Sequence, residues 1–309
     1  MEIINIRSYA KINLSLDILG VLPDGYHQVS MIMQQIDLHD QVAVRFTPGR
    51  EEKIIVNTNK PYIPKDERNI AYKAAALMRA EFGFGRGGEI RVDIKKVIPV
   101  GAGLAGGSGN GGAVLMGLNH LWKLGLSLEE LCHLGEKLGS DVAFSLRGMA
   151  YSNKNLKLDK EPLACSCALA EGTGTTLRKI SPADAFVVLS KPPLSVSTKE
   201  AYREIDRRLE EGNIPHPDNE ELAMGLKTKQ WEKVKENMIN VLEFHTLKRY
   251  DKAMYTKNKM QQVSGKNPVL MSGSGPTIYA LFKNKDDAQE AYTKMKEVNR
   301  ETFLTRTVV

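Results

Sequence analysis

A run of glycines between residues 101 and 112 constrains this chain more than any other feature of its sequence. Seven of the residues from Gly101 to Gly112 are glycine. Glycine adopts positive φ angles at little cost and lets the backbone approach a bulky ligand. Before the run, Gly88–Ile98 alternates like a strand, and after it Ala113–Trp122 has the apolar spacing of a helix. This order predicts a phosphate-binding loop, because the free N–H groups and the positive dipole end of a helix N-terminus attract anions.

Two familiar nucleotide motifs do not account for this run. No Gly-Lys-Ser/Thr follows the glycines, and no acidic residue follows a second strand at the distance of a dinucleotide-binding fold. A flexible linker is the simplest alternative, but linkers rarely join a patterned strand to an apolar helix. Within the run, Ser108 and Asn110 have polar side chains that could bind a ligand. The hydroxyl group could bind a phosphate oxygen or Mg²⁺, and it could equally be the N-cap of the helix.

Three further segments contain candidate functional residues whose roles the residues alone leave open. Asp141 follows Gly139-Ser140, where an aspartate is more often a helix cap than a catalytic base. Lys11 lies in an alternating strand, where a lysine usually points to solvent. A second glycine-rich turn, Met271–Thr277, lies between two strands and suits either a close approach to a ligand or a tight hairpin.

The remaining pattern predicts a chain of mixed helices and strands. Asn69 is expected to cap a helix that ends at Gly83, Ser127 and Glu130 have the spacing of a capping box, and Ser140-Asp141 is expected to cap a short helix. Residues 151–160 read as an exposed loop. The other predicted helices are 198–210, 219–226, 230–239, 251–261 and 286–298, and the predicted strands are 3–8, 11–19, 28–36, 41–46, 168–180, 185–190, 269–271, 277–282 and 302–308.

Composition narrows the class of protein. The chain has 309 residues, 42% hydrophobic and 26% charged, which is ordinary for one large or two medium domains, and two are expected. Three cysteines without metal-type spacing fit a reducing cytoplasm, and neither a signal-like N-terminus nor a membrane-length apolar run is found. The net charge is +6 and the isoelectric point is about 9.0, but basic residues are interleaved with 37 acidic ones. The expected partners are therefore anionic nucleotides, with no nucleic acid and no membrane.

Four segments together resemble the superfamily of galacto-, homoserine, mevalonate and phosphomevalonate (GHMP) kinases. Gly101–Ala113 resembles the shared phosphate loop, Gly139–Val142 the catalytic segment and Ser272–Gly275 the third motif. The opening, Ser8–Leu14 followed by Leu22–His27, is similar to a branch of the superfamily that acts on an alcohol linked to cytidine diphosphate. The resemblance runs nearly end to end.

This resemblance implies an α+β fold of two lobes with the active site between them. The N-terminal lobe, residues 1–184, would resemble domain 2 of ribosomal protein S5 and bind ATP, with residues 151–167 as an insertion. The C-terminal lobe, residues 185–309, would be ferredoxin-like and bind the substrate. A monomer or a weak homodimer is expected.

The implied activity is that of a small-molecule kinase with an alcohol group as acceptor. It would use ATP and Mg²⁺ to phosphorylate the tertiary 2-hydroxyl of the cytidine-diphosphate-linked alcohol, in non-mevalonate isoprenoid precursor synthesis. By the resemblance, Asp141 takes the proton from this hydroxyl, Lys11 keeps Asp141 ionised, and Asn13 orients the pair. Tyr26 would stack on the cytosine ring and His27 would bind its edge.

The implied ATP site consists of the glycine loop and two residues that would line the adenine pocket. Its members are Asn69, Lys96, Pro99, Gly101, Gly103, Leu104, Ala105, Gly106, Gly107, Ser108, Gly109 and Asn110. Ser108 is also the implied ligand of Mg²⁺, and Gly273 and Ser274 join the substrate site.

The sequence departs from the family pattern at several positions. Gly109, Gly111 and Gly112 stand where the family usually has Ser or Thr, Ala and Ala, which costs the helix up to about 1 kcal/mol each and predicts a mobile loop. Residues 151–167 separate two segments that the family usually joins directly, and we interpret them as a surface insertion. Thr175 stands where the family usually has Glu, and nothing in the sequence explains this change.

Two rival functions remain open at this point. A non-catalytic nucleotide-binding relative is compatible with the glycine substitutions, although the presence of both Lys11 and Asp141 opposes it. A GHMP kinase for another alcohol, such as homoserine or mevalonate, is opposed by Asp24–His27, because neither alcohol has a base to stack.

Overall fold

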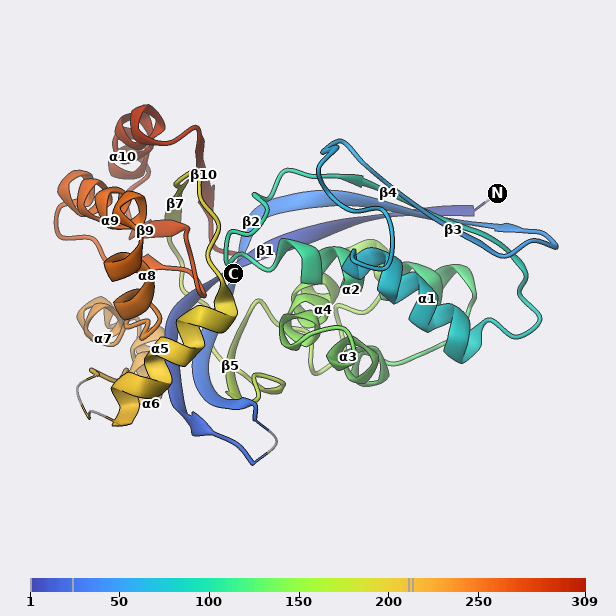
Figure 1. Ribbon diagram of the computed structural model, residues 1–309, viewed down its shortest axis with the longest axis horizontal. Helices are drawn as coiled ribbons and strands as arrows, with labels where there is room; N and C mark the ends of the chain where they lie inside the picture. Colours follow the sequence, from blue (N-terminus) through green and yellow to red (C-terminus); the bar gives the residue numbers. More distant parts are fainter. Residues whose placement is uncertain (1, 24, 211, 213) are drawn as a thin grey trace. The chain divides into compact units, whose positions relative to one another are not determined.

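The protein is described here by a computed structural model that covers residues 2–23, 25–210, 212 and 214–309 (Figure 1). Asp24, which belongs to the segment Leu22–His27 of the resemblance, lies outside the described residues. The chain forms two compact units, and each is assembled from segments that are distant in the sequence. The first unit comprises Met1–Ala10, Leu38–Val100 and Ala105–Ser166, and the second comprises Lys11–Asp37, Gly101–Leu104 and Cys167–Val309. The contiguous division between residues 184 and 185 stays a prediction.

The first unit is a sheet with helices packed on one face (Figure 1). Its strands belong to β1 (Glu2–Val21), β2 (His27–Pro48), β3 (Lys53–Thr58) and β4 (Gly88–Lys95), and β4 pairs antiparallel with Gln41–Pro48 of β2 and parallel with β3. The helices are α1 (Ile70–Phe82), α2 (Gly106–Leu121), α3 (Leu128–Glu136) and α4 (Ser140–Ser152). Alternate residues of β2 and β4 are apolar and buried, for example Val42, Val44, Ile90 and Val92. Alternate side chains of a strand point to the same face, so this apolar face of the sheet is the one that the helices cover.

Two long strands replace the four short strands predicted for the N-terminal part of the chain. The predicted strands 28–36 and 41–46 were expected to be separate, but β2 continues from one into the other. Asp40 is tolerated inside the strand because its Oδ1 accepts hydrogen bonds from the backbone N–H groups of Val97 and Ile98. Strand β3 and a later helix, α8 (Glu243–Arg249), were not predicted.

The predicted helix caps are confirmed in two places and wrong in one. Asn69 accepts a hydrogen bond from the N–H of Ala71 at the start of α1, and Ser127 forms a capping box with Glu130 at the start of α3. The N-cap of α4 is Gly139, so Ser140 and Asp141 already belong to the helix. This helix is also longer than predicted, because it reaches Ser152.

The segment predicted as an exposed loop at 151–160 is only partly exposed. It contains the end of α4 and a 3₁₀ turn, η1 (Lys154–Leu156). Asn153 and Leu156 are buried. The amide of Asn153 accepts from the N–H of Arg7 at 2.9 Å and donates to the carbonyl of Arg7 at 3.0 Å. The segment is therefore attached to β1 by side-chain to backbone hydrogen bonds that its polar composition did not reveal.

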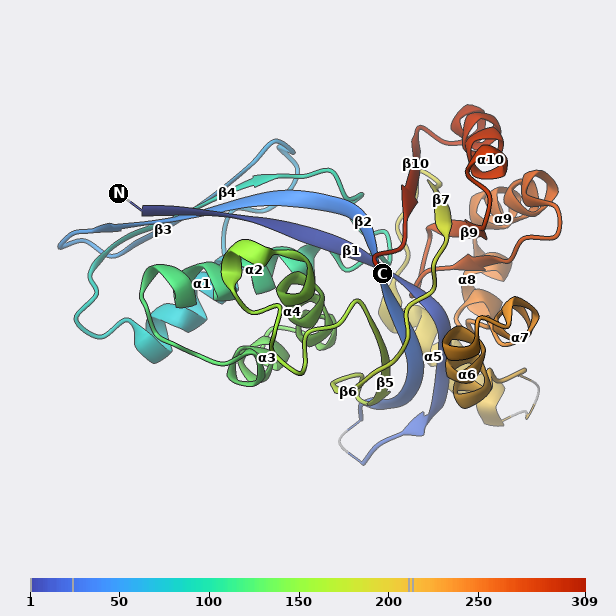
Figure 2. The same cartoon turned by 180° about the vertical axis from the view of Figure 1, so that it is seen from behind.

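The second unit contains the hairpin of β5 (Cys167–Gly172) and β6 (Thr176–Lys179), which pairs with Val29–Gln34 of β2 (Figure 2). It also contains a four-stranded antiparallel sheet in the order β10-β7-β9-β8. The strands are β7 (Phe186–Lys191), β8 (Val269–Met271), β9 (Ile278–Phe282) and β10 (Glu301–Arg306).

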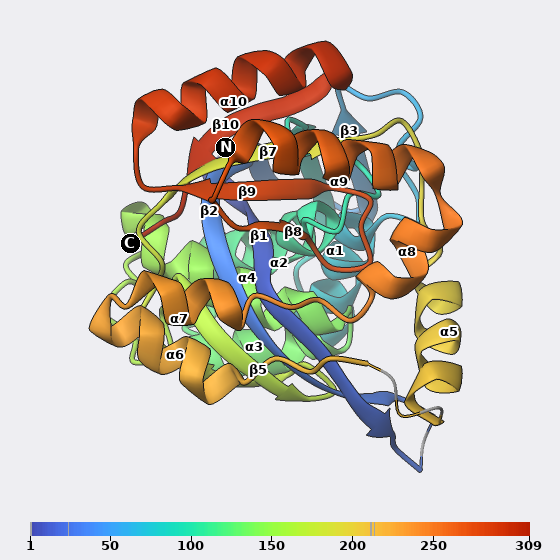
Figure 3. The same ribbon diagram turned by 90° about the vertical axis from the view of Figure 1, so that its left-hand side faces the viewer.

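Helices α9 (Asp251–Ser264) and α10 (Lys285–Val298) pack along this four-stranded sheet (Figure 3). The succession β7, α9, β8, β9, α10, β10 is the β-α-β-β-α-β arrangement of ferredoxin-like folds, as predicted. Helices α5 (Thr198–Glu210), α6 (Asn219–Thr228), α7 (Trp231–Glu236) and α8 lie between β7 and α9 in the sequence. No helix among the described residues is long and apolar enough to cross a membrane.

Candidate active site

Three of the predicted segments meet within the second unit. The N–H of Lys11 donates to the carbonyl of Leu104 at 3.2 Å, and Ser272 Oγ donates to the carbonyl of Gly103 at 2.9 Å. A Cβ atom on Gly103 would overlap the carbonyl oxygen of Ser272, and one on Gly273 would lie 3.6 Å from Lys11 Nζ. Both glycines also have positive φ angles, 72° and 57°. The second glycine turn is therefore a close approach of backbone to backbone beside Lys11.

Lys11 is buried rather than solvated, with 5% of its surface exposed. Its Nζ donates to Asn13 Oδ1 at 2.5 Å. The same face of β1 continues with Ser15 and Asp17, which are also buried, whereas the alternate positions are apolar. This stripe of Lys11, Asn13, Ser15 and Asp17 is visible in the sequence as polar residues at every second position of an apolar strand. Of these four, only Lys11 and Asn13 were predicted as site residues.

Partners from the C-terminal half of the chain complete this stripe. Ser15 Oγ donates to Asn219 Oδ1 at 2.5 Å, and His216 Nδ1 lies 2.7 Å from Asp17 Oδ1. Burial raises the pKa of Asp17, and the hydrogen bond and charge of His216 partly offset this effect. A polar row next to Lys11 suits a substrate rich in hydroxyl and phosphate groups.

The predicted cytidine residues lie at the start of β2. Tyr26 is 67% exposed, so its ring is accessible for stacking. His27 is half-buried and contacts two residues of α5, Tyr202 and Asp206. Neither partner was predicted as a site residue.

The second half of the glycine run lies in the first unit, where it forms the start of α2. The run was expected to be a loop up to Gly112, but the helix begins at Gly106. Ala105 is the N-cap residue, with φ 55° and no side-chain cap hydrogen bond. The N–H groups in the first turn of α2 therefore have no side-chain acceptor at the N-cap. Such N–H groups can bind an anion. Ser108 lies in this turn and is half-buried.

A buried charge pair stands beside this turn. Lys96 Nζ lies 2.5 Å from Asp40 Oδ2 and 3.3 Å from Asn110 Oδ1, and a Cβ atom on Gly106 would lie 2.8 Å from the same Nζ. Lys96 is 6% exposed and Asp40 is fully buried. Burial lowers the pKa of Lys96, and the carboxylate of Asp40 partly restores it. Asp40 was missed as a site residue, because it falls between two strands that the sequence predicts to be separate, 28–36 and 41–46.

The glycines of the run differ in their surroundings. Gly101 and Gly107 are exposed, and added Cβ atoms there would meet nothing closer than 3.8 Å and 3.6 Å. A Cβ atom on Gly109, in contrast, would lie 2.5 Å from Ser8 Oγ. Only some of these glycines are therefore open to a ligand, and the others allow close internal packing.

Four other predicted residues have the following local surroundings. Asn69 caps α1 and donates to the carbonyl of Pro64 at 2.7 Å. Pro99 is buried just before the glycine run. Asp141 is half-buried in the first turn of α4, where a carboxylate complements the positive end of the helix dipole. Ser274 Oγ is hydrogen-bonded to Thr198 Oγ1 at 2.9 Å.

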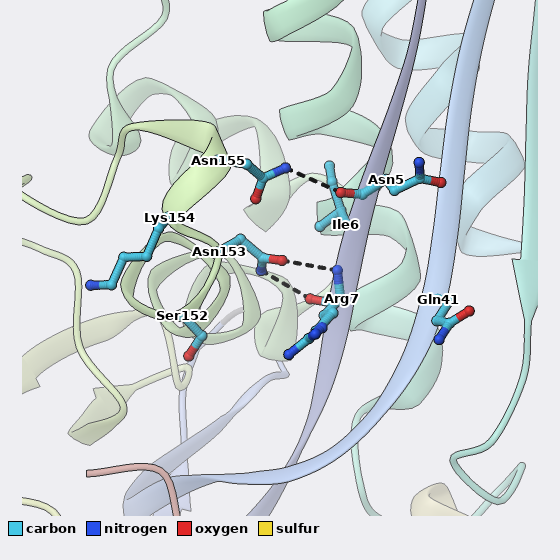
Figure 4. Close-up of a pocket in the computed structure, with 8 residues that line it drawn as sticks. All are labelled: Asn5, Ile6, Arg7, Gln41, Ser152, Asn153, Lys154 and Asn155. Atoms are coloured by element: carbon cyan, nitrogen blue, oxygen red, sulfur yellow. Dashed lines mark hydrogen bonds between the residues drawn. The ribbon is translucent and has the colours of Figure 1, made fainter.

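None of the predicted site residues lines a pocket of about 550 Å³ in the first unit (Figure 4). It is lined by Asn5, Ile6, Arg7, Gln41, Ser152, Asn153, Lys154 and Asn155. Within the described residues, no group of three or more His, Cys, Asp or Glu side chains is arranged to bind a metal ion.

The ferredoxin-like sheet and the glycine-rich start of α2 define a GHMP kinase. Residues 69–149 match the family model of the GHMP kinases N terminal domain, and residues 230–301 match that of the GHMP kinases C terminal domain. Within this class, the chain belongs to the 4-diphosphocytidyl-2-C-methyl-D-erythritol kinase family. It is 40% identical to a kinase of that name from Geobacillus kaustophilus, over 98% of this chain and 96% of the relative. A Clostridium botulinum kinase of the same name is 41% identical, over 98% of this chain and 100% of the relative.

Solved structures agree with this assignment. A crystal structure of 4-(cytidine 5'-diphospho)-2C-methyl-D-erythritol kinase matches with a TM-score of 0.75 and 26% identity, over 99% of this chain and 100% of the other. The homoserine kinase of Cytophaga hutchinsonii matches with a TM-score of 0.68 at 18% identity, over 100% of this chain and 95% of the other. The second likeness concerns the fold alone.

Proposed function

We propose that this protein transfers the γ-phosphoryl group of ATP to the 2-hydroxyl group of 4-diphosphocytidyl-2-C-methyl-D-erythritol, a step in the synthesis of isoprenoid precursors. The observation that carries this proposal is the near full-length identity of about 40% to kinases of that name. The buried polar stripe beside Lys11 and the accessible Tyr26 ring add support, because the substrate has a polar chain and a base to stack.

The chemical roles follow from the residue types. Asp141 is the proposed base that takes the proton of the tertiary hydroxyl group, and Lys11 is the proposed cation that favours the ionised carboxylate. Asn13 holds the ammonium group of Lys11 in place. Phosphoryl transfer depends mainly on positioning and on charge stabilisation, so these side chains need a fixed phosphate site.

The start of α2 fits the phosphates of ATP. Its first turn lacks a side-chain cap, and Gly101 and Gly107 leave the backbone open to an anion. Lys96 and Asn69 are proposed to line the adenine pocket. The remaining residues of the implied ATP site are proposed to belong to the phosphate loop. Mg²⁺ is bound largely by substrate phosphates in such enzymes and neutralises their charge, and Ser108 would offer it one protein oxygen.

The test is ADP release by the purified protein with magnesium and ATP. We expect release with the cytidylated alcohol and none with homoserine or mevalonate. Asp141→Asn should lower kcat by roughly 10²- to 10⁴-fold because it removes the base. Asp159→Asn is the matched control, since this carboxylate pairs with Lys154 at 3.3 Å, outside the proposed site. Equal release with homoserine would refute the substrate, and full activity of Asp141→Asn would refute the base.

A further inference from the structure

The contacts of His27 determine which of its ring nitrogens carries a proton. Its Nε2 lies 2.8 Å from Oδ1 of Asp206 in α5. An ionised carboxylate can only accept hydrogen bonds, so Nε2 must be the donor. The ring of Tyr202, one helical turn before Asp206, meets the His27 ring with 4.6 Å between centroids and 61° between planes. Asp206 thus selects the tautomer, and Tyr202 restricts rotation of the ring.

This tautomer makes the other nitrogen, Nδ1, an acceptor. None of the residues that the structure describes donates a hydrogen bond to Nδ1. The His27 side chain is 19% exposed, so a ligand can reach it. A ligand that faces Nδ1 must therefore supply a donor, because a second acceptor would meet the nitrogen lone pair.

We propose that Asp206 is a positioning residue that makes the base site selective for cytosine over uracil. This inference rests on the proposed function, which places the cytosine ring at Tyr26 and His27. Cytosine presents an amino group, a donor, at the position where uracil presents a carbonyl oxygen, an acceptor. Nδ1 of His27 accepts a hydrogen bond from the amino group of cytosine. It repels the carbonyl oxygen of uracil, because both atoms are acceptors. Asp206 touches neither base and acts only through His27.

Loss of the carboxylate has a specific consequence. Without Asp206, the proton of neutral His27 can move to Nδ1, and this N–H group then donates to the carbonyl oxygen of uracil. Removal of the Asp206 carboxylate should therefore lower the selectivity for cytosine over uracil. A general loss of activity is not expected. A merely structural salt bridge would not change the ratio between the two bases.

Steady-state kinetics with the full chain test this assignment, using the cytidylated alcohol and its uridine analogue. The wild type should prefer the cytidylated substrate in kcat/KM by about 10- to 100-fold. Asp206→Ala should raise KM for this substrate about tenfold, leave kcat and the KM for ATP within about twofold, and bring the preference near one. Asp206→Glu should restore part of the preference. Glu200→Gln, which removes another carboxylate from α5, should behave like the wild type. An unchanged preference in Asp206→Ala would overturn the inference.

A second measurement does not depend on activity. Nitrogen-15 NMR of the imidazole rings in the wild-type protein should show the proton of His27 on Nε2, and a proton on Nδ1 would overturn the inference. The same spectrum of Asp206→Ala should show a mixture of tautomers. If the wild type phosphorylates neither substrate, the proposed function fails, and the NMR result still decides whether Asp206 sets the tautomer.

Discussion

Four hydrogen-bond donors converge on the carboxylate of Asp40, which is fully buried in β2. Two are the backbone N–H groups of residues 97 and 98, and the others are Lys96 Nζ and Asn110 Nδ2. Removal of one partner from such a buried pair leaves an uncompensated charge, which is strongly unfavourable. Here the charge left behind would be the ammonium of Lys96 beside the first turn of α2, where the helix dipole also disfavours a cation.

Asp40→Asn is therefore expected to lower the free energy of unfolding by about 3–5 kcal/mol at pH 7, measured by urea denaturation. The loss should shrink at alkaline pH. Burial lowers the pKa of Lys96 below 10.5, so the folded state binds fewer protons there than the unfolded chain, and stability rises with pH between the two pKa values. Without Asp40 the folded pKa falls further, and this rise begins at lower pH. A loss that grows with pH would contradict the argument.

A double-variant cycle isolates the pair. Lys96→Met alone should also destabilise the protein, since it leaves the charge of Asp40 buried without its cation. The combination of Asp40→Asn and Lys96→Met should cost less than the sum of the two single changes. Simple additivity would show that the two side chains act independently.

The candidate site was predictable from the sequence where several motifs agreed, and not from single residues. Taken alone, Lys11 predicts a solvent-exposed side chain, which is wrong, because nothing in a lone lysine shows that its face of the strand is buried. Asp206 carried no signal at all, since its contact with His27 joins residues 179 positions apart. Its function depends on a tertiary contact that neither propensity nor spacing encodes.

At the level of elements, helix α2 shows why glycine content misleads. Glycine disfavours helices by about 1 kcal/mol relative to alanine, so the run was predicted to be a loop up to Gly112. In the structure these glycines are helical, and a Cβ atom on Gly111 would lie 2.5 Å from Cγ2 of Ile70 in α1. A Cβ atom on Gly112 would lie 2.8 Å from Cε of Met149. Close helix packing, which overrides propensity, explains the glycines that the family pattern lacks. The predicted mobility of the run stays a prediction.

Two alanine substitutions separate propensity from packing. Gly111→Ala should lower the free energy of unfolding by about 1–3 kcal/mol, because the new methyl group overlaps Ile70. Gly107→Ala is the matched change in the same helix, with 3.6 Å to its nearest neighbour. It should leave stability unchanged or raise it by up to about 1 kcal/mol. Both are measured by urea denaturation without nucleotide, and stabilisation by Gly111→Ala would refute the packing argument.

In residues 151–160, asparagine side chains bind the backbone of a neighbouring strand. Asn153 bonds to the backbone of Arg7, and Asn155 Nδ2 donates to the carbonyl of Asn5 at 3.2 Å. Their amides thus occupy backbone groups of β1 that could otherwise pair with another chain. Polar composition predicted a loop, because asparagine in a sequence does not reveal whether its amide binds water or a strand.

At the scale of the whole molecule, the elements were largely predictable but their grouping was not. Local patterns indicated the ferredoxin-like order of the last strands and helices. The two compact units, however, each contain one part of β1 and one part of β2, because both strands pass from one unit to the other. Local patterning contains no information on such interleaving, and a single boundary near residue 184 is the natural prediction from a linear sequence.

This interleaving predicts that the chain cannot be cut into two folding fragments at residue 184. The second unit needs Lys11–Asp37, which a fragment of residues 185–309 lacks. In that fragment the buried Tyr279 hydroxyl would lose its acceptor, the carbonyl of Asn13 at 2.7 Å, and Asn240 would lose its bridge to Leu16. An unpaired buried hydroxyl and newly exposed apolar surface both oppose folding.

We therefore expect fragment 185–309 to show no cooperative thermal transition and poor dispersion in its proton NMR spectrum, whereas the intact chain shows both. Mixing it with fragment 1–184 should restore the native signals, because that fragment supplies the missing strands. The matched control is the intact chain cleaved after residue 184 once it has folded, which should remain associated and native. A cooperative transition of fragment 185–309 alone would instead mean that its four-stranded sheet and helices are sufficient to fold, and that the contiguous boundary is a real one.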